Sequence, residues 1–116
     1  MLRNPRQHDE KHLAWVRTLP CICCGNPHET EAAHIRFSDA RIGKNNPGVG
    51  AKPDDKFVLP MCGFHHRMQH SGDEKQFWLK QGIDAVLYAL ALYSVSGDHE
   101  RGSLIVASAN AAVECV

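Results

Sequence analysis

The chain has 116 residues, of which 43% are hydrophobic and only 7% aromatic, with 13 basic side chains balancing 13 acidic ones. This length suits one domain, and so few aromatic residues predict a modest core that needs a staple such as a bound metal. Zero net charge gives no sign of a nucleic-acid partner by itself. The longest apolar stretch, residues 83–95, is too short and interrupted to cross a bilayer, which argues against a membrane partner.

The first twelve residues are polar and lack the apolar run of a signal peptide, so we expect a cytoplasmic protein. Thiols stay reduced in that compartment. The 5 cysteines and 8 histidines are therefore interpreted as metal ligands before disulfides are considered.

In the first half of the chain, residues 8–19 alternate apolar and charged positions as a short amphipathic helix does, and Pro20 ends it. A knuckle-like turn follows at residues 21–25, where Gly25 supplies backbone freedom. Residues 31–37 suggest a short strand or the last turn before one. Residues 38–56 are rich in Gly, Asn, Pro and Lys and predict a long irregular loop.

In the second half, residues 57–61 are a candidate buried strand and residues 62–70 open a helix. Residues 73–81 form a helix that Gly82 ends, and residues 84–94 form another with Asp84 as its N-cap. The tail, residues 96–116, adds a helix or frays. The expected core residues of these helices are Phe77, Trp78, Leu79, Val86, Leu87, Leu90 and Leu92.

Two short motifs have the spacing of zinc half-sites: Cys21-x-x-Cys24, followed by Gly25, and Cys62-x-x-His65. Two intervening residues let both side chains converge from one turn, and four thiolate or imidazole donors complete a closed structural Zn²⁺ site. The alternative is that these cysteines are merely buried small residues. Cys23 is an alternative ligand to Cys24, although a glycine directly after the second ligand favours Cys24, and Cys115 has no partner spacing.

His66 and His70 are four residues apart, so on a helix they share one face and can share one cation. His34 lies upstream in a short apolar, strand-like setting. The alternative for His34 is a packed, hydrogen-bonded side chain. The alternatives for His66 and His70 are membership of an expanded zinc site and exposure at the surface. The other histidines show no spacing logic and are expected at the surface: His8, His12, His28 and His99.

Charge is unevenly distributed. The segment from Arg36 to Arg67 holds six basic and three acidic residues, whereas the segment from Ser71 onward holds three basic and six acidic ones. A basic segment beside a histidine cluster suits a polyanionic substrate, and a solvated loop is the equally plain alternative.

The order of these motifs resembles the HNH, or ββα-metal, nuclease family, and in particular its zinc-containing phage and prophage members. The shared elements are CxxCG, then Ala-His-Ile, a Gly- and Asn-rich loop, PDDKFVLPMC, and a His-His pair with a third histidine four residues on. The resemblance covers residues 8–95. It implies an α+β fold: a small zinc-stapled ββα-metal core with flanking helices and a long irregular loop, in one domain spanning residues 1–116 with a helical tail at 96–116.

The resemblance also implies roles. His34 would be the general base, His66 and His70 would hold a catalytic cation, and the structural zinc ligands would be Cys21, Cys24, Cys62 and His65. Family members usually carry Asp or His immediately before the base as another ligand of the catalytic cation, where this chain has Ala33. Asp55, or Asp54, is expected to supply that carboxylate or the middle position of the motif, while a loop-capping role for Asp55 is the alternative.

The implied function is metal-dependent endonuclease cleavage of single- or double-stranded DNA in a bacterium or phage-infected host, using Mg²⁺, Mn²⁺ or Zn²⁺ besides the structural zinc. A neutral imidazole with a pKa near 6.5 suits proton abstraction from water at neutral pH, and a cation neutralises charge on the phosphorane. The alternative is a non-catalytic or degenerate zinc module that binds nucleic acid or protein. Because a small neutral chain has little DNA-binding surface, a DNA-delivering protein partner or a homodimer is a further expectation.

Overall fold

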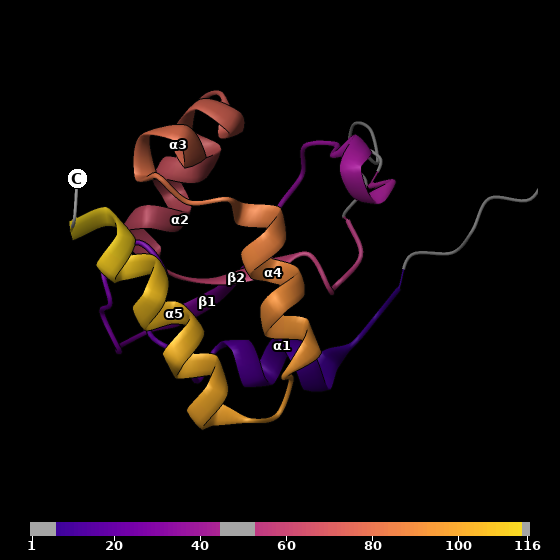
Figure 1. The fold of residues 1–116 in the computed structure, drawn as a ribbon, viewed down its shortest axis with the longest axis vertical. Helices are drawn as coiled ribbons and strands as arrows, with labels where there is room; N and C mark the ends of the chain where they lie inside the picture. Colours follow the sequence, from indigo (N-terminus) through magenta and orange to yellow (C-terminus); the bar gives the residue numbers. More distant parts are fainter. Residues whose placement is uncertain (1–6, 45–52, 115–116) are drawn as a thin grey trace, which may run out of the picture.

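The computed structural model describes residues 7–44 and 53–114 and has an α+β architecture (Figure 1). Within those ranges, five α-helices surround one two-stranded sheet. In chain order the elements are α1 (Glu10–Val16), β1 (Thr30–His34), the 3-10 turn η1 (Ala40–Ile42), β2 (Val58–Cys62), α2 (Gly63–His70), α3 (Glu74–Gln81), α4 (Ala85–Ser94) and α5 (His99–Glu114). None of the described helices is both long and apolar enough to cross a bilayer.

The sheet pairs β1 with β2 in antiparallel register, from Thr30 opposite Cys62 to His34 opposite Val58. All five residues of β2 are buried. The chain passes directly from β2 into α2 at Cys62, and β1 pairs with β2, so these three elements pack together as a ββα unit. The expected α+β class is confirmed.

Alternation along β1 sends neighbouring side chains to opposite faces of the sheet. Ala32 packs toward α1, against a small cluster of Leu13, Val16 and Val58. Ala33 points into the larger core, which also contains Leu59, Met61, Phe77 and Trp78. The α1 helix and the larger core therefore cover different faces of the sheet.

Helix α2 runs beside β1 in the same direction. Near its start, His66 contacts Glu31, and in its last turn Gln69 contacts the main chain of His34. The end of β1 and the end of α2 therefore lie together.

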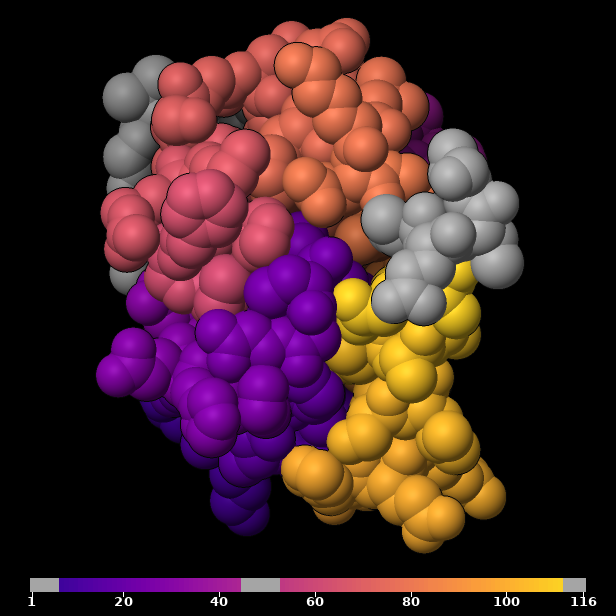
Figure 2. All heavy atoms as spheres, turned by 90° about the vertical axis from the view of Figure 1, so that its left-hand side faces the viewer, coloured from indigo at the N-terminus to yellow at the C-terminus, as the bar shows by residue number. Residues whose placement is uncertain are grey.

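Helix α5 folds back onto the N-terminal segment, and the yellow-orange helix lies against the indigo and violet residues in Figure 2. Gly102 permits the close approach, because a Cβ at that position would stand 2.6 Å from Cζ2 of Trp15. The tail is thus a packed helix. Cys115 and residues 45–52 of the expected loop lie outside the described residues.

Three expectations about burial are wrong. His12 was expected at the surface and is 1% exposed, held by its Nδ1 contact with Ser96 Oγ at 2.7 Å. Leu79 and Leu87 were expected in the core and are 72% and 48% exposed. The expected burial of Phe77, Trp78, Val86 and Leu92 is confirmed, and Ala89 joins them on the buried side of these helices.

Candidate functional site

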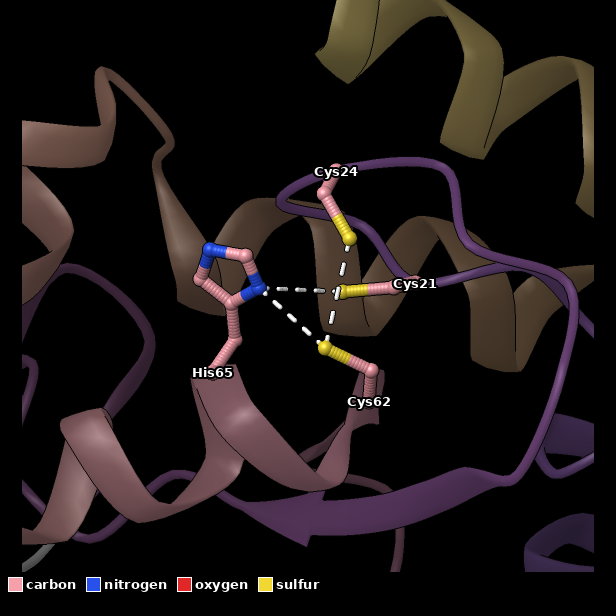
Figure 3. A group of neighbouring side chains, drawn as sticks. All are labelled: Cys21, Cys24, Cys62 and His65. Carbon is pink, nitrogen blue, oxygen red and sulfur yellow. Dashed lines mark hydrogen bonds between the residues drawn. The ribbon is translucent and has the colours of Figure 1, made fainter.

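Four side chains from the two half-site motifs converge at the junction of β2 and α2 (Figure 3). The ligand atoms of Cys21, Cys24, Cys62 and His65 all lie within 4.8 Å of one another. Cys62 ends β2, and His65 lies in the first turn of α2. The predicted grouping of these four residues is confirmed, and the group is able to hold a metal ion.

Local backbone geometry explains why the first half-site points inward. The amide of Gly25 donates to the carbonyl of Cys21 at 2.8 Å, and Gly25 takes φ 76°, a left-handed conformation that favours glycine. The amide of Ile22 donates to the carbonyl of Pro60 in β2 at 2.8 Å. The knuckle is therefore fastened to the strand that carries the second half-site.

Cys24, rather than Cys23, completes the group. The backbone amide of Cys23 lies 3.4 Å from Cys21 Sγ and donates to it. A separate hydrogen bond between the Cys23 and Cys21 side chains is the largest cause that lowers the pKa of Cys21 to about 4; burial opposes it, and the backbone amides of Cys62, Cys24 and Cys23 add to it. The same side-chain hydrogen bond, with burial next, raises the pKa of Cys23.

The spacing of the ligand atoms fits a small tetrahedral ion. Tetrahedral Zn²⁺ with Zn–S bonds of about 2.3 Å separates two sulfurs by about 3.8 Å. Cys24 Sγ and Cys62 Sγ are 3.9 Å apart, and His65 Nδ1 lies 3.9 Å from Cys21 Sγ and 3.2 Å from Cys62 Sγ. The donor set is of the thiolate and imidazole type that structural zinc prefers.

A second arrangement lies at the other end of β1, where His34 meets Asp55. His34 Nε2 and Asp55 Oδ1 are 2.9 Å apart, with the side chains 17% and 1% exposed. An ionised carboxylate only accepts hydrogen bonds, so Nε2 carries the proton and the imidazole lone pair resides on Nδ1. This is the geometry of a histidine base oriented by a buried carboxylate.

The structure distinguishes Asp55 from Asp54. Asp55 Oδ2 accepts from the amide of Asp9, just before α1, at 2.7 Å. The other carboxylate oxygen, Oδ1, contacts His34 Nε2. Asp54 Oδ1 instead accepts from the amide of Gln7 at 2.8 Å. Asp55 is therefore the carboxylate that orients His34, and Asp54 fastens the N-terminal segment.

His66 and His70 lie on one face of α2, with ring centres 4.9 Å apart and planes inclined by 51°. Two imidazoles bound to one cation at about 2.1 Å place their ring centres about 5 Å apart, so the spacing fits a shared ion. Burial first, and then His66, lower the pKa of His70, which favours the neutral ring that a metal needs.

The two histidine arrangements are adjacent but leave the sheet on different faces. His34 shares the face of Ala32 and α1, whereas Glu31, which contacts His66, shares the face of Ala33. Across residues 7–44 and 53–114, the Cys/His cluster is the one group of three or more His, Cys, Asp and Glu side chains close enough to share an ion. Asp55 thus pairs with His34 on one face, and the histidine pair of α2 lies toward the other, with Gln69 linking α2 to the main chain of His34.

Two polar contacts of this region were not anticipated from the sequence. Glu31 Oε1 lies 2.6 Å from His66 Nδ1, and Gln69 Nε2 donates to the carbonyl of His34 at 3.1 Å. Glu31 lies three residues before His34, and Gln69 directly precedes His70. Both contacts depend on β1 and α2 lying side by side, so a prediction of that packing could have identified Glu31 and Gln69.

Comparison with known proteins places the chain in a family. Residues 2–95 match the family model described as "Protein of unknown function (DUF968)", and the chain belongs to that family. It is 42% identical over 62 residues to the uncharacterized protein YdfU of Escherichia coli (strain K12). That match covers 53% of this chain and 16% of YdfU, so the chain spans only a small part of its relative's length. No solved structure matches it.

Proposed function

We propose that the protein is a metal-dependent endonuclease of HNH type that hydrolyses phosphodiester bonds in DNA. The observation that carries the proposal is the His34–Asp55 pair, whose Nε2 and Oδ1 atoms are 2.9 Å apart at the end of β1. It is supported by His66 and His70, which lie together on helix α2 of the ββα unit. A carboxylate-oriented histidine supports proton transfer, and a pair of adjacent imidazoles supports cation binding. Both functions assist phosphodiester hydrolysis.

In this proposal His34 is the general base. Asp55 holds the proton on Nε2, so Nδ1 takes the proton from the attacking water. The His34 side chain is 17% exposed and the Asp55 side chain is 1% exposed. The proposed base is therefore accessible to solvent, and the carboxylate that orients it is buried. Asp55 acts through His34 and is assigned as a positioning residue rather than a cation ligand.

His66 and His70 would hold the catalytic cation, Mg²⁺, Mn²⁺ or Zn²⁺, which when bound would neutralise charge on the phosphorane and assist the leaving oxygen. Ala33 supplies no ligand at the position where the resemblance expects one. Two imidazoles are therefore the cation's protein donors here. The remaining coordination positions would be left for water and substrate oxygens.

The Cys21, Cys24, Cys62 and His65 group would hold a structural Zn²⁺. Its position at the turn from β2 into α2 supports that role, because the ion would fix the helix histidines relative to the strands. Exposed Arg67, between His66 and His70 in sequence, places a cationic side chain on the same helix for phosphate contact.

The test is nicking of supercoiled plasmid by zinc-loaded protein with Mg²⁺ or Mn²⁺. His34→Ala is expected to lose about 10²–10⁴-fold in rate, the usual contribution of a general base. The control is His28→Ala, which removes an exposed histidine before β1 and should cut at the wild-type rate. Wild-type protein that cuts neither single- nor double-stranded DNA with any divalent cation would overturn the proposal in favour of a zinc-containing binding module.

A further inference from the structure

The proposed function does not use the contact between Glu31 and His66, which lies beside the histidine pair of α2. Glu31 Oε1 and His66 Nδ1 are 2.6 Å apart, and the side chains are 53% and 23% exposed. A pair this exposed contributes little to stability. Its geometry, however, determines which nitrogen of His66 carries the proton.

An ionised carboxylate can only accept, so Nδ1 of His66 is the donor in this hydrogen bond. The lone pair of the neutral ring is then on Nε2, and the His70 ring lies 4.9 Å away on the same helix face. Histidines that bind metals commonly donate their other N–H to a carboxylate, which fixes the tautomer and makes the ligating nitrogen more basic.

We infer that Glu31 is a positioning residue for a divalent cation bound by His66 and His70: its carboxylate holds His66 as the Nδ1–H tautomer and presents Nε2 to the cation. The inference rests on the cation site of the proposed function and deepens it. Because Ala33 provides no ligand, the two imidazoles carry the protein's share of binding, and the orientation and tautomer of His66 matter correspondingly more.

Strand geometry supports this role. Glu31 lies two residues before Ala33 in β1, so both side chains leave the same face of the sheet, the one beside α2. Gly63 at the start of α2 adds room, because a Cβ there would lie 3.3 Å from Glu31 Oε2 and 3.1 Å from an Arg67 guanidinium nitrogen. The absence of a side chain at residue 63 lets Glu31 approach His66 closely.

The experiment combines two measurements on the full, zinc-loaded chain without DNA. The ¹⁵N chemical shifts of the His66 ring report its tautomer, and calorimetric titration with Mn²⁺ reports a second cation beyond the zinc. Glu31→Ala is expected to lose the Nδ1–H tautomer and to bind Mn²⁺ about 10–100-fold more weakly, as is usual when such a supporting carboxylate is removed. Glu31→Gln keeps an oxygen acceptor and should recover part of both signals.

The matched control is Glu29→Ala, which removes an exposed carboxylate two residues earlier and should leave both signals unchanged. If Glu31→Ala keeps the tautomer, or binds Mn²⁺ as tightly as Glu29→Ala does, the inference is overturned. It is also overturned if wild-type protein binds no Mn²⁺ beyond its zinc. A Glu31-dependent Mn²⁺ site in a protein that does not cut DNA would sink the nuclease proposal and leave this inference standing.

Discussion

The Gln69 side chain links the end of α2 to the end of β1, because its Nε2 donates to the main-chain carbonyl of His34 at 3.1 Å. Gln69 is 1% exposed, and the same nitrogen donates to Glu74 Oε2 at 2.7 Å. A buried amide held at both of its N–H groups fixes the helix relative to the strand. The residue after Gln69 is His70, so this contact sets the distance between the proposed base and the proposed cation pair.

Replacing Gln69 should therefore damage both stability and activity. In Gln69→Ala the His34 carbonyl and the Glu74 carboxylate lose a donor, which should lower the free energy of unfolding by about 1–3 kcal/mol. Urea unfolding measures the first effect and plasmid nicking the second. Gln76→Ala, at an exposed position of α3, should change neither. Wild-type stability in Gln69→Ala would show that the contact is incidental.

Zinc removal should unfold the ββα unit. The cluster joins the knuckle at residues 21–25 to the turn from β2 into α2, so its binding free energy is also folding free energy. Treatment with a strong chelator should reduce the far-UV circular dichroism signal, and added Zn²⁺ should restore it. Retention of the full signal in metal-free protein would contradict a structural role.

The choice between neighbouring cysteines is tested separately. Cys24→Ser should lower the zinc content measured by atomic absorption, because Cys24 Sγ lies in the cluster. Cys23→Ala should keep one zinc per chain, since Cys23 contributes its backbone amide to Cys21 Sγ. If Cys23→Ala lost zinc and Cys24→Ser kept it, Cys23 would be the ligand and Cys24 would not.

Asp55→Asn should slow DNA cleavage more than it weakens substrate binding. An amide in place of the carboxylate no longer selects the Nε2–H tautomer of His34, so kcat should fall by about 10²-fold or more while KM changes little. Asp54→Asn is the matched control, because the Asp54 carboxylate accepts a hydrogen bond from the Gln7 amide and does not orient His34. Equal losses in the two variants would remove the special role of Asp55.

Much of the local structure follows from the sequence, because capping and turn chemistry act over a few residues. Asp84 accepts from the amide of Leu87 and begins α4, and Gly82 ends α3, both as predicted. The left-handed conformation of Gly82 explains why a glycine ends this helix. The four cluster residues converge as their spacing indicates. These features depend on interactions within a turn or between two tight motifs.

The errors arise where tertiary packing decides. Helix α4 is apolar on nearly every side, so its periodicity does not reveal that Leu87 faces outward. His12 is buried because Tyr93 of α4 packs edge-on against the imidazole ring of His12 in α1. The His34–Asp55 pair spans 21 residues of sequence, and only the antiparallel pairing of β1 with β2 brings the two together.

Gly102 is expected to be essential for the packing of α5. In Gly102→Ala the new methyl group would stand 2.6 Å from Trp15 Cζ2 and 3.1 Å from Leu19 Cδ2, so a ring or the helix must shift. Overpacking of this kind costs about 1–3 kcal/mol, which offsets or exceeds the gain of about 1 kcal/mol from replacing a helical glycine. Gly72→Ala, with open space around it, should be neutral. Thermal unfolding measures both, and an unchanged midpoint for Gly102→Ala would contradict the close contact.

His12 should make the fold sensitive to mild acid. Burial lowers its pKa from the ordinary 6.5, although the Asp9 and Asp55 charges oppose the effect, and Tyr93 completes its surroundings. The folded state therefore disfavours the protonated ring, while the unfolded chain takes up the proton below about pH 6.5. The contribution of His12 to the free energy of unfolding is therefore fully present above about pH 6.5. It is lost as the pH falls from 6.5 toward the lower pKa that His12 has in the folded protein. Urea midpoints at pH 7.5 and pH 5 should consequently differ more in wild-type protein than in His12→Gln, which does not titrate. Equal differences in the two proteins would show that other groups carry the acid sensitivity.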